Sequence, residues 1–251
     1  MNSKVKKSFW QLYAWVYDAV LLRFLPYREL IAHVTSALDA REGWAILDAG
    51  CGTGNFIYHI IQACPGVKAV GVDFAAAMLS RAMLKIRKAA PVSINSVIFR
   101  EADLNLPLPF TDEEFAGAIC VNVLYAVDDP KFLLGEIYRV LQKNGRLILV
   151  TPPVQPQIWP IVRAHACRLK EASPSGWIFT LAGQVVRLIP LLTVFLLINI
   201  FIKSRQSFHF FNREELSLLV KNCGFEVVSI VPVYGGQDWL VEAKKQHSGL
   251  L

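Results

Sequence analysis

The sequence predicts an α/β protein: a doubly wound, mostly parallel, seven-stranded sheet with helices on both faces and an apolar helical insertion after the fifth strand. Three observations support this fold class. Short apolar runs alternate with helical patterns across residues 45–151, which is the order of right-handed β-α-β units. The alternation stops over residues 152–207, where prolines and long apolar stretches dominate. It resumes with a helix and two strands between positions 212 and 243.

Each element follows from the spacing of its apolar side chains. Before the sheet, apolar side chains within residues 9–24 recur at i, i+3, i+4 and i+7, which predicts an amphipathic helix. A second helix is predicted after Pro26, at 27–40. The strands are predicted at 45–49, 68–72, 96–100, 115–122, 146–151, 225–231 and 239–243, the last two pairing as an antiparallel edge. The helices among them are predicted at 55–63, 75–88, 131–142 and 212–222, with Asn144-Gly145 ending the third and Asn212 capping the fourth.

The composition narrows the class of protein. Apolar residues make up 54% of the 251 residues and charged residues only 18%, so some apolar surface is expected to face something other than water. The formal charge of +6 favours acidic partners, either nucleic acid or an anionic membrane surface. The five cysteines form no CxxC pair, so we expect neither a disulfide framework nor a metal site, and free thiols fit the reducing cytoplasm.

The strongest motif lies at residues 46–56, where the strand 45–49 meets the next helix. Its glycines at 50, 52 and 54 let the backbone turn sharply and approach a ligand, and the following helix offers free N–H groups to a carboxylate or a phosphate. A dinucleotide site needs a third glycine at position 55, where this chain has Asn55. A Walker A loop needs a lysine that the motif lacks, so both of these sites are disfavoured.

The run LDAGCGTG (47–54) resembles motif I of the class I S-adenosylmethionine (SAM)-dependent methyltransferases, in particular the ubiquinone and menaquinone biosynthesis methyltransferases. GVDFAAAML (71–79), EADLNLPLPF (101–110) and the strand 118–123 with residues 128–150 resemble the later motifs of this family, in the same order. The resemblance covers 45–150 well and 208–243 loosely, and it fails over 152–207. It implies a Rossmann-like SAM methyltransferase fold, methyl-transfer activity and SAM as the cofactor.

The resemblance also implies which residues hold SAM. Asp48 is expected near the methionine amino group. The carboxylate of Asp73 is expected to accept hydrogen bonds from both ribose hydroxyls, with helix capping as its structural alternative. Asp103 is expected beside the adenine amino group, with a surface-loop role as the alternative. The implied cofactor-binding residues are Asp48, Gly50, Cys51, Gly52, Gly54, Asp73, Phe74, Met78, Asp103, Leu104 and Asn122.

The acceptor side is less well defined. Asn122 ends the fourth strand, where ligands bind in sheets of this type, so the residues after it are expected to face the acceptor. Many members of the resembling family carry a histidine pair where this chain has Tyr125-Ala126. Tyr125, His165 and His209 are candidates for a proton acceptor, but no motif fixes any of them, so the catalytic residues stay open. The substrate-facing candidates are Tyr13, Tyr17, Leu124 and Tyr125.

The insertion contains the most apolar part of the chain, residues 177–202. Thr180, Gln184 and Arg187 share one helical face in its first half, and residues 188–202 are almost unbroken apolar sequence. This run is shorter than the roughly 20 apolar residues of a transmembrane helix, so a segment that lies in an anionic membrane surface is favoured over a full span. Basic residues on both sides favour anionic lipid head groups. The alternative is a helical pair buried in a homodimer interface.

These expectations divide the chain into an N-terminal helical lid (1–44), a SAM-binding core (45–151), an insertion that contacts substrate and membrane (152–207) and the C-terminal part of the core sheet (208–251). The predicted function is SAM-dependent methyl transfer to a lipid-soluble molecule, such as a quinone precursor or a phospholipid, by a cytoplasmic protein peripherally associated with the membrane. The alternative is a non-catalytic module that binds a protein partner through the insertion. A nucleic-acid substrate is disfavoured, because the basic residues flank apolar sequence and form no polar, aromatic-interleaved stripe.

Overall fold

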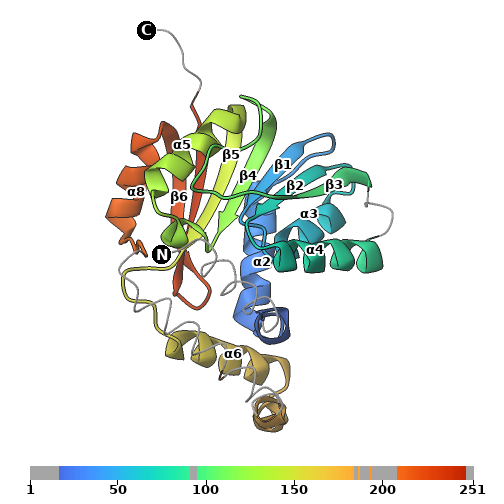
Figure 1. Cartoon of the computed structure of the whole chain (residues 1–251). Helices are drawn as coiled ribbons and strands as arrows, with labels where there is room; N and C mark the ends of the chain where they lie inside the picture. Colours follow the sequence, from blue (N-terminus) through green and yellow to red (C-terminus); the bar gives the residue numbers. More distant parts are fainter. Residues whose placement is uncertain (1–16, 91–94, 184–185, 187–192, 194–207, 247–251) are drawn as a thin grey trace.

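A seven-stranded sheet of order β3-β2-β1-β4-β5-β7-β6 forms the centre of the molecule (Figure 1). The computed structural model describes residues 17–90, 95–183, 186, 193 and 208–246. Strands β1 to β5 pair in parallel, and β7 runs antiparallel to both β5 and β6, which confirms the predicted sheet. The strands are β1 (Ala45–Ala49), β2 (Lys68–Asp73), β3 (Val97–Glu101), β4 (Phe115–Val121), β5 (Leu141–Thr151), β6 (Phe225–Val233) and β7 (Asp238–Lys245).

Helices cover both faces of this sheet. Figure 1 shows α2, α3 and α4 on one face and α5 and α8 on the other. Ile46 packs with α2 and α3, whereas its neighbour Leu47 packs with α5 and α8, because successive side chains of a strand point to opposite faces. The helices are α2 (Leu25–Leu38), α3 (Asn55–Ala63), α4 (Ala76–Ala89), α5 (Pro130–Val140) and α8 (Arg213–Asn222). Asn212 caps α8 as predicted, through a reciprocal pair of hydrogen bonds with Glu215.

Strand β5 begins earlier than the sequence pattern indicated. The predicted helix 131–142 ends at Val140 in α5, and Leu141 already pairs with Phe115 of β4. Asn144 has a φ of 62° and lies with Gly145 inside β5, where the register with β4 shifts. A turn-forming pair of residues can form an irregularity within a strand as well as the end of a helix. The prediction that Asn144-Gly145 terminates a helix was therefore wrong.

The insertion begins with a helix whose position the sequence did not indicate, α6 (Trp159–Ala172). Pro160 lies in its first turn, where a missing N–H costs no hydrogen bond, so a proline in this block begins a helix. Figure 1 shows α6 beyond the end of the sheet, near the start of α2. The backbone N–H of Leu25 donates a hydrogen bond to His165 Nδ1 at 3.1 Å and joins the two helices.

The apolar segment 177–202 is described only in part. Residues 177–183 are helical, and of the remainder only positions 186 and 193 are among the described residues. The N-terminal helix is represented by residues 17–21, so Tyr13 also lies outside the described part of the chain. Within the described ranges, no helix is both long and apolar enough to cross a bilayer.

Candidate cofactor and acceptor site

The glycine loop between β1 and α3 turns at the carboxyl edge of the sheet. The backbone N–H groups of Gly50 and Cys51 donate to the carbonyl of Val72 at 2.8 and 2.9 Å. Gly50 has a φ of +85°, and a Cβ atom there would lie 2.2 Å from Cγ2 of Val123. Gly52 has a φ of +52°, and a Cβ atom there would meet nothing within 4 Å. The loop therefore packs tightly on the residues after β4 at its first glycine and faces open space at its second.

Asp73, the last residue of β2, is bonded to this loop. Its Oδ2 accepts a hydrogen bond from the backbone N–H of Gly52 at 3.0 Å, and its Oδ1 accepts one from Ala75 at 2.8 Å, next to the start of α4. Burial raises the pKa of this carboxyl to about 6. Each carboxylate oxygen can accept a second hydrogen bond, so the same group can support the helix start and still bind the hydroxyls of a ligand.

Asp48 is a buried carboxyl group with an unsatisfied oxygen. It is only 1% exposed, and its Oδ2 has no hydrogen-bond partner among the described residues. Burial, and then the charge of Asp73, raise its pKa well above the usual range. A buried polar atom of this kind needs a partner. The amino group of the methionine part of SAM would supply donors and a positive charge, so Asp48, Asp73 and the open side of Gly52 fit this cofactor.

The residues expected on the adenine side lie after β2 and β3. The backbone N–H of Ala102 donates to the carbonyl of Asp73 at 3.1 Å, which places the ends of these two strands side by side. Asp103 is exposed, and its Oδ1 accepts hydrogen bonds from the backbone and side-chain nitrogens of Asn105 at 3.0 and 2.8 Å. Met78 and Leu104 are buried and Phe74 is partly buried. Their contacts with the cofactor remain predictions.

On the other side of the loop, Asn122 follows the end of β4. Its backbone has a φ of 55°, and its Nδ2 donates a hydrogen bond to Oδ2 of Asp238 at 3.1 Å. Tyr125 lies in the 3-10 turn η2 (Leu124–Ala126), and its ring stacks on Phe210 with a centroid distance of 5.8 Å. Leu124 is fully buried in the main core, so in this structure its side chain packs the core. The structure thus brings Asn122 and Tyr125 to the same edge as the glycine loop.

Asp238, the first residue of β7, is a buried carboxyl group at this edge that sequence analysis did not single out. It is 5% exposed, and burial raises the pKa of its carboxyl to about 7. Its only sequence signal is an acidic residue that follows Gly235-Gly236-Gln237 and precedes an apolar run. The neighbouring strand could not be known without the order β5-β7-β6, so nothing in the sequence joined Asp238 to Asn122.

The two candidate histidines contact backbone groups. His165 Nδ1 accepts the hydrogen bond from Leu25, and its ring lies 5.0 Å from that of Phe24. The ring Nε2 of His209 lies 3.2 Å from the carbonyl of Asp128, and its backbone N–H donates to the carbonyl of Tyr125 at 2.8 Å. Their catalytic roles remain predictions. These contacts join α6 to the start of α2, and residues 208–211 to the turn after β4.

A polar cluster that the sequence did not indicate lies over the start of α3. It joins Asp18 from the N-terminal helical residues, Thr53 from the glycine loop, Asn55 at the start of α3 and Lys85 of α4. Tyr17 packs next to it, with its ring 6.3 Å from the ring of Tyr27. The N-terminal residues are thus bonded directly to the cofactor loop.

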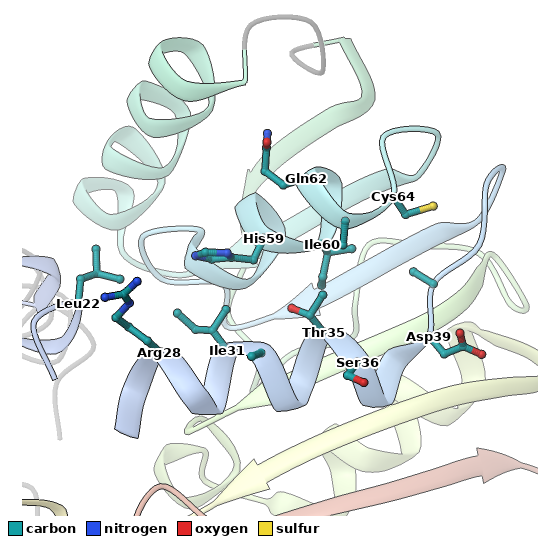
Figure 2. Close-up of a pocket in the computed structure, with 13 residues that line it drawn as sticks. Leu22, Arg28, Ile31, Thr35, Ser36, Asp39, His59, Ile60, Gln62 and Cys64 are labelled. Atoms are coloured by element: carbon teal, nitrogen blue, oxygen red, sulfur yellow. The ribbon is translucent and has the colours of Figure 1, made fainter. Parts of the chain in front are cut away.

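A separate groove lies between α2 and α3, and Figure 2 shows the side chains of both helices around it. Its volume is about 1000 Å³, and Arg28, Thr35 and His59 are among the residues that line it. None of the residues predicted for the cofactor lines this groove. Burial, and then the charges of Lys85 and Arg28, lower the pKa of His59.

Comparison with known proteins agrees with this geometry. The family model of a methyltransferase domain matches residues 47–149. A demethylmenaquinone methyltransferase from Thermus thermophilus is 38% identical over 112 residues, which are 45% of this chain and 49% of that protein. The ubiquinone/menaquinone biosynthesis C-methyltransferase UbiE from Desulfotalea psychrophila is 33% identical over 134 residues, which are 53% of this chain and 51% of that protein. The chain therefore spans about half the length of the curated relatives it matches.

The fold is shared with solved structures at lower identity. A SAM-dependent methyltransferase from Aquifex aeolicus superposes with a TM-score of 0.57 at 15% identity, covering 88% of this chain and 90% of that chain. At this identity the likeness establishes the fold only. Together, the sheet order and the family match lead to one assignment: residues 47–149 match the methyltransferase domain family, in a fold shared with SAM-dependent methyltransferases, and the cofactor is SAM.

Proposed function

We propose that this protein transfers a methyl group from SAM to a lipid-soluble small molecule of the quinone-precursor type at a membrane surface. One observation carries the methyltransferase part: the unsatisfied carboxyl oxygen of Asp48 lies beside a glycine loop that Asp73 holds through Gly52. The acceptor class is supported by the relatives, which are named for menaquinone and ubiquinone biosynthesis.

Bound SAM supplies a methyl group that its positive sulfur has already activated, so the protein mainly has to orient the acceptor and exclude water. Asp48 would hold the amino group of the cofactor and Asp73 its ribose. Asn122 and Tyr125 lie where an acceptor would meet the glycine loop.

Aromatic side chains lie around the proposed acceptor side of the site. The ring of Tyr125 lies 5.7 Å from Phe208 and 5.8 Å from Phe210. Tyr27 of α2 lies 6.3 Å from Tyr234, which follows β6. Aromatic walls with a few polar atoms are typical of sites for flat, apolar small molecules. This surrounding supports a ring-bearing acceptor over a strongly charged one.

The exposed face of α6 supports the membrane part of the proposal. Trp159 is 76% exposed, and Arg163 and Lys170 follow it at a spacing that places all three on the same face of the helix. Phe179, in the next helical stretch, is 79% exposed. Tryptophan and phenylalanine beside basic side chains are the residues that bind an anionic lipid interface. A membrane contact here would bring a lipid-soluble acceptor to the end of the sheet where α6 lies.

The test combines cofactor binding with product identification. Titration calorimetry should show SAM binding to the full chain and much weaker binding to the Asp73→Asn variant. Labelled SAM with a total membrane lipid extract, kept reduced, should yield a labelled product that partitions into organic solvent and has the mass of a methylated quinol. Failure to bind SAM would contradict the methyltransferase function. SAM binding with the label only in water-soluble products would contradict the acceptor class.

A further inference from the structure

We propose that Asp238 accepts the proton of the methyl acceptor and that Asn122 holds the Asp238 carboxylate in position. This inference rests on the proposed function, because it names the group that activates the acceptor in that reaction. The sequence offers no histidine at the turn after β4, where Tyr125-Ala126 stands. An acceptor that carries a hydroxyl group still needs a proton acceptor at the site.

The strand order places Asp238 beside the cofactor loop. Because β7 is antiparallel to β5, its first residues lie at the edge where the parallel strands end, and Thr151 at the end of β5 pairs with Trp239. Asn122, one residue after β4, reaches Asp238 through the 3.1 Å hydrogen bond. Val123 touches the glycine loop at Gly50. Asn122 therefore stands between the cofactor loop and the carboxyl group of Asp238.

Three buried polar atoms at this edge are unsatisfied. Asn122 Oδ1, Thr151 Oγ1 and Trp239 Nε1 have no hydrogen-bond partner among the described residues. They come from the ends of β4 and β5 and the start of β7, which are neighbours in the sheet. Trp239 packs on the α5 and α8 face with the alternate residues of β5, whereas Asn122 bonds directly to Asp238. Buried polar atoms normally find partners, so the unsatisfied Oδ1 of Asn122 beside Asp238 indicates the position of a polar part of a ligand. A hydroxyl-bearing ring would supply hydrogen-bond donors to Asp238 and to Asn122 Oδ1.

The surroundings of Asp238 suit proton transfer near neutral pH. Asn122, which donates a hydrogen bond to Asp238, is a neutral amide, and burial raises the pKa of the Asp238 carboxyl to about 7. The ionisable groups coupled to it are Tyr125 of η2 and Tyr234 of the turn between β6 and β7. Burial raises the pKa of both phenols, so they are neutral where Asp238 titrates. Gln237, its neighbour in the turn, bonds through its side chain to the backbone of Gln157 and adds no charge.

The proposed step balances for a hydroquinone acceptor. The hydroxyl proton passes to the Asp238 carboxylate while the ring carbon forms a bond to the methyl carbon, and the pair of electrons of the methyl–sulfur bond stays on sulfur. The ring carbon then loses its hydrogen as a proton to water, and Asp238 returns its proton to the oxygen. The net products are the methylated hydroquinone, S-adenosylhomocysteine and one proton.

The decisive variant is Asp238→Asn, with Glu242→Gln as its matched control, because Glu242 is a partly exposed carboxylate of the same strand. Single-turnover rates are measured with labelled SAM and chemically reduced demethylmenaquinone in detergent between pH 5.5 and 8.5. We expect Asp238→Asn to lower the rate by about 10²- to 10⁴-fold. Its affinity for SAM should change less than about threefold, and Glu242→Gln should behave as the wild type. The wild-type rate should decrease as the pH is lowered below about 7. This decrease, the acid limb of the pH–rate profile, should be absent in Asp238→Asn.

A second measurement needs neither cofactor nor acceptor. The pKa of Asp238 in the folded chain, about 7, lies above the value of an unfolded aspartate, about 3.9, so its stabilising effect is complete below that lower value and is lost as the pH rises through 7. The melting temperature of the wild type should therefore fall between pH 5 and 8, and it should fall less for Asp238→Asn. Asn122→Asp places a second carboxyl group beside Asp238 and should move the acid limb of the rate to higher pH.

Three results would overturn the proposal, and they differ from one another. A wild-type enzyme that leaves the hydroquinone unmethylated removes the proposed function together with the role of Asp238. A wild type that methylates it while Asp238→Asn keeps the same rate and the same acid limb removes the role of Asp238 alone. Loss of rate in Asp238→Asn with an equal loss of SAM affinity would show a structural role and would also contradict proton transfer.

Discussion

The Nζ atom of Lys85 lies 2.9 Å from Oδ2 of Asp18, so α4 is joined to the N-terminal helical residues across the start of α3. The other oxygen of Asp18 accepts hydrogen bonds from Thr53 Oγ1 at 2.6 Å and from Asn55 Nδ2 at 3.0 Å. Thr53 and Asn55 are the two neighbours of Gly54 in the cofactor loop. The segment predicted to cover the cofactor is therefore bonded to the loop that is predicted to bind it.

Removal of this ion pair should weaken the attachment of the N-terminal helical residues to the glycine loop, without removing the residues predicted to contact the cofactor. Lys85 is 18% exposed and Asp18 is 24% exposed, so Lys85→Met leaves a partly buried carboxylate with only neutral partners. We expect the free energy of unfolding to fall by about 1–2 kcal/mol and the rate of SAM release to rise about tenfold. Stopped-flow fluorescence and urea denaturation measure the two effects. Lys88→Met, on the exposed face of α4, is the control, and equal release rates in both variants would contradict the role of the pair.

The tight contact at Gly50 gives a prediction with an internal control. A Cβ atom at Gly50 would lie 2.2 Å from Val123 Cγ2, whereas at Gly43 it would meet nothing within 4 Å, although φ is similar at the two sites, +85° and +83°. Both alanine variants lose about 1 kcal/mol of stability because an alanine must adopt the positive φ. Gly50→Ala loses about 1–3 kcal/mol more because its Cβ atom overpacks against Val123. Urea denaturation should therefore give a clearly lower free energy of unfolding for Gly50→Ala than for Gly43→Ala. Val123→Ala in the Gly50→Ala background should recover part of the loss, and no recovery would show that the clash is not the cause.

The sequence was sufficient to predict the strands and helices at the core of the fold, because the signals for these elements are local. Glycines at fixed spacing, apolar runs and an Asn212 cap each determine their own segment, and the structure places the strands from β1 to β4 within about two residues of the predicted positions. Asn144-Gly145 is the exception. The same two residues are suited to a helix end and to an irregular strand, and only the pairing of Leu141 with Phe115 decides between them.

Parts of the site that depend on distant residues could not be predicted. Asp18 and Lys85 are far apart in the chain and meet only because α3 and α4 pack on the same face of the sheet. Asp238 reaches Asn122 only because β7 enters the sheet beside β5. No spacing in the sequence encodes either contact, since each depends on the order of strands and helices in space.

The affinity for SAM should rise with pH. Burial raises the pKa of Asp73 to about 6, and burial with the nearby Asp73 charge raises that of Asp48. Because a cationic ligand favours the ionised carboxylates, binding must release protons where these groups are still protonated in the free protein. The dissociation constant should therefore fall from pH 5 to pH 7. Calorimetry at pH 6 in buffers of different ionisation enthalpy should detect the released protons, and Asp73→Asn should release fewer. Affinity that is constant across this range would contradict the assignment of both carboxylates to the site.

Binding to anionic membranes should depend on the exposed aromatic residues near α6. Trp159 and Phe179 are 76% and 79% exposed, and insertion of two such side chains in a lipid interface is worth a few kcal/mol in total. Flotation with phosphatidylcholine vesicles that contain phosphatidylglycerol should recover the wild type. The double variant Trp159→Ser/Phe179→Ser should lose at least about tenfold in vesicle affinity. The control Ile98→Ser/Leu218→Ser removes two apolar side chains that are exposed on β3 and α8, away from α6, and should bind as the wild type does. If both double variants float equally well, this face does not contact the membrane, and the acceptor must reach the site by another route.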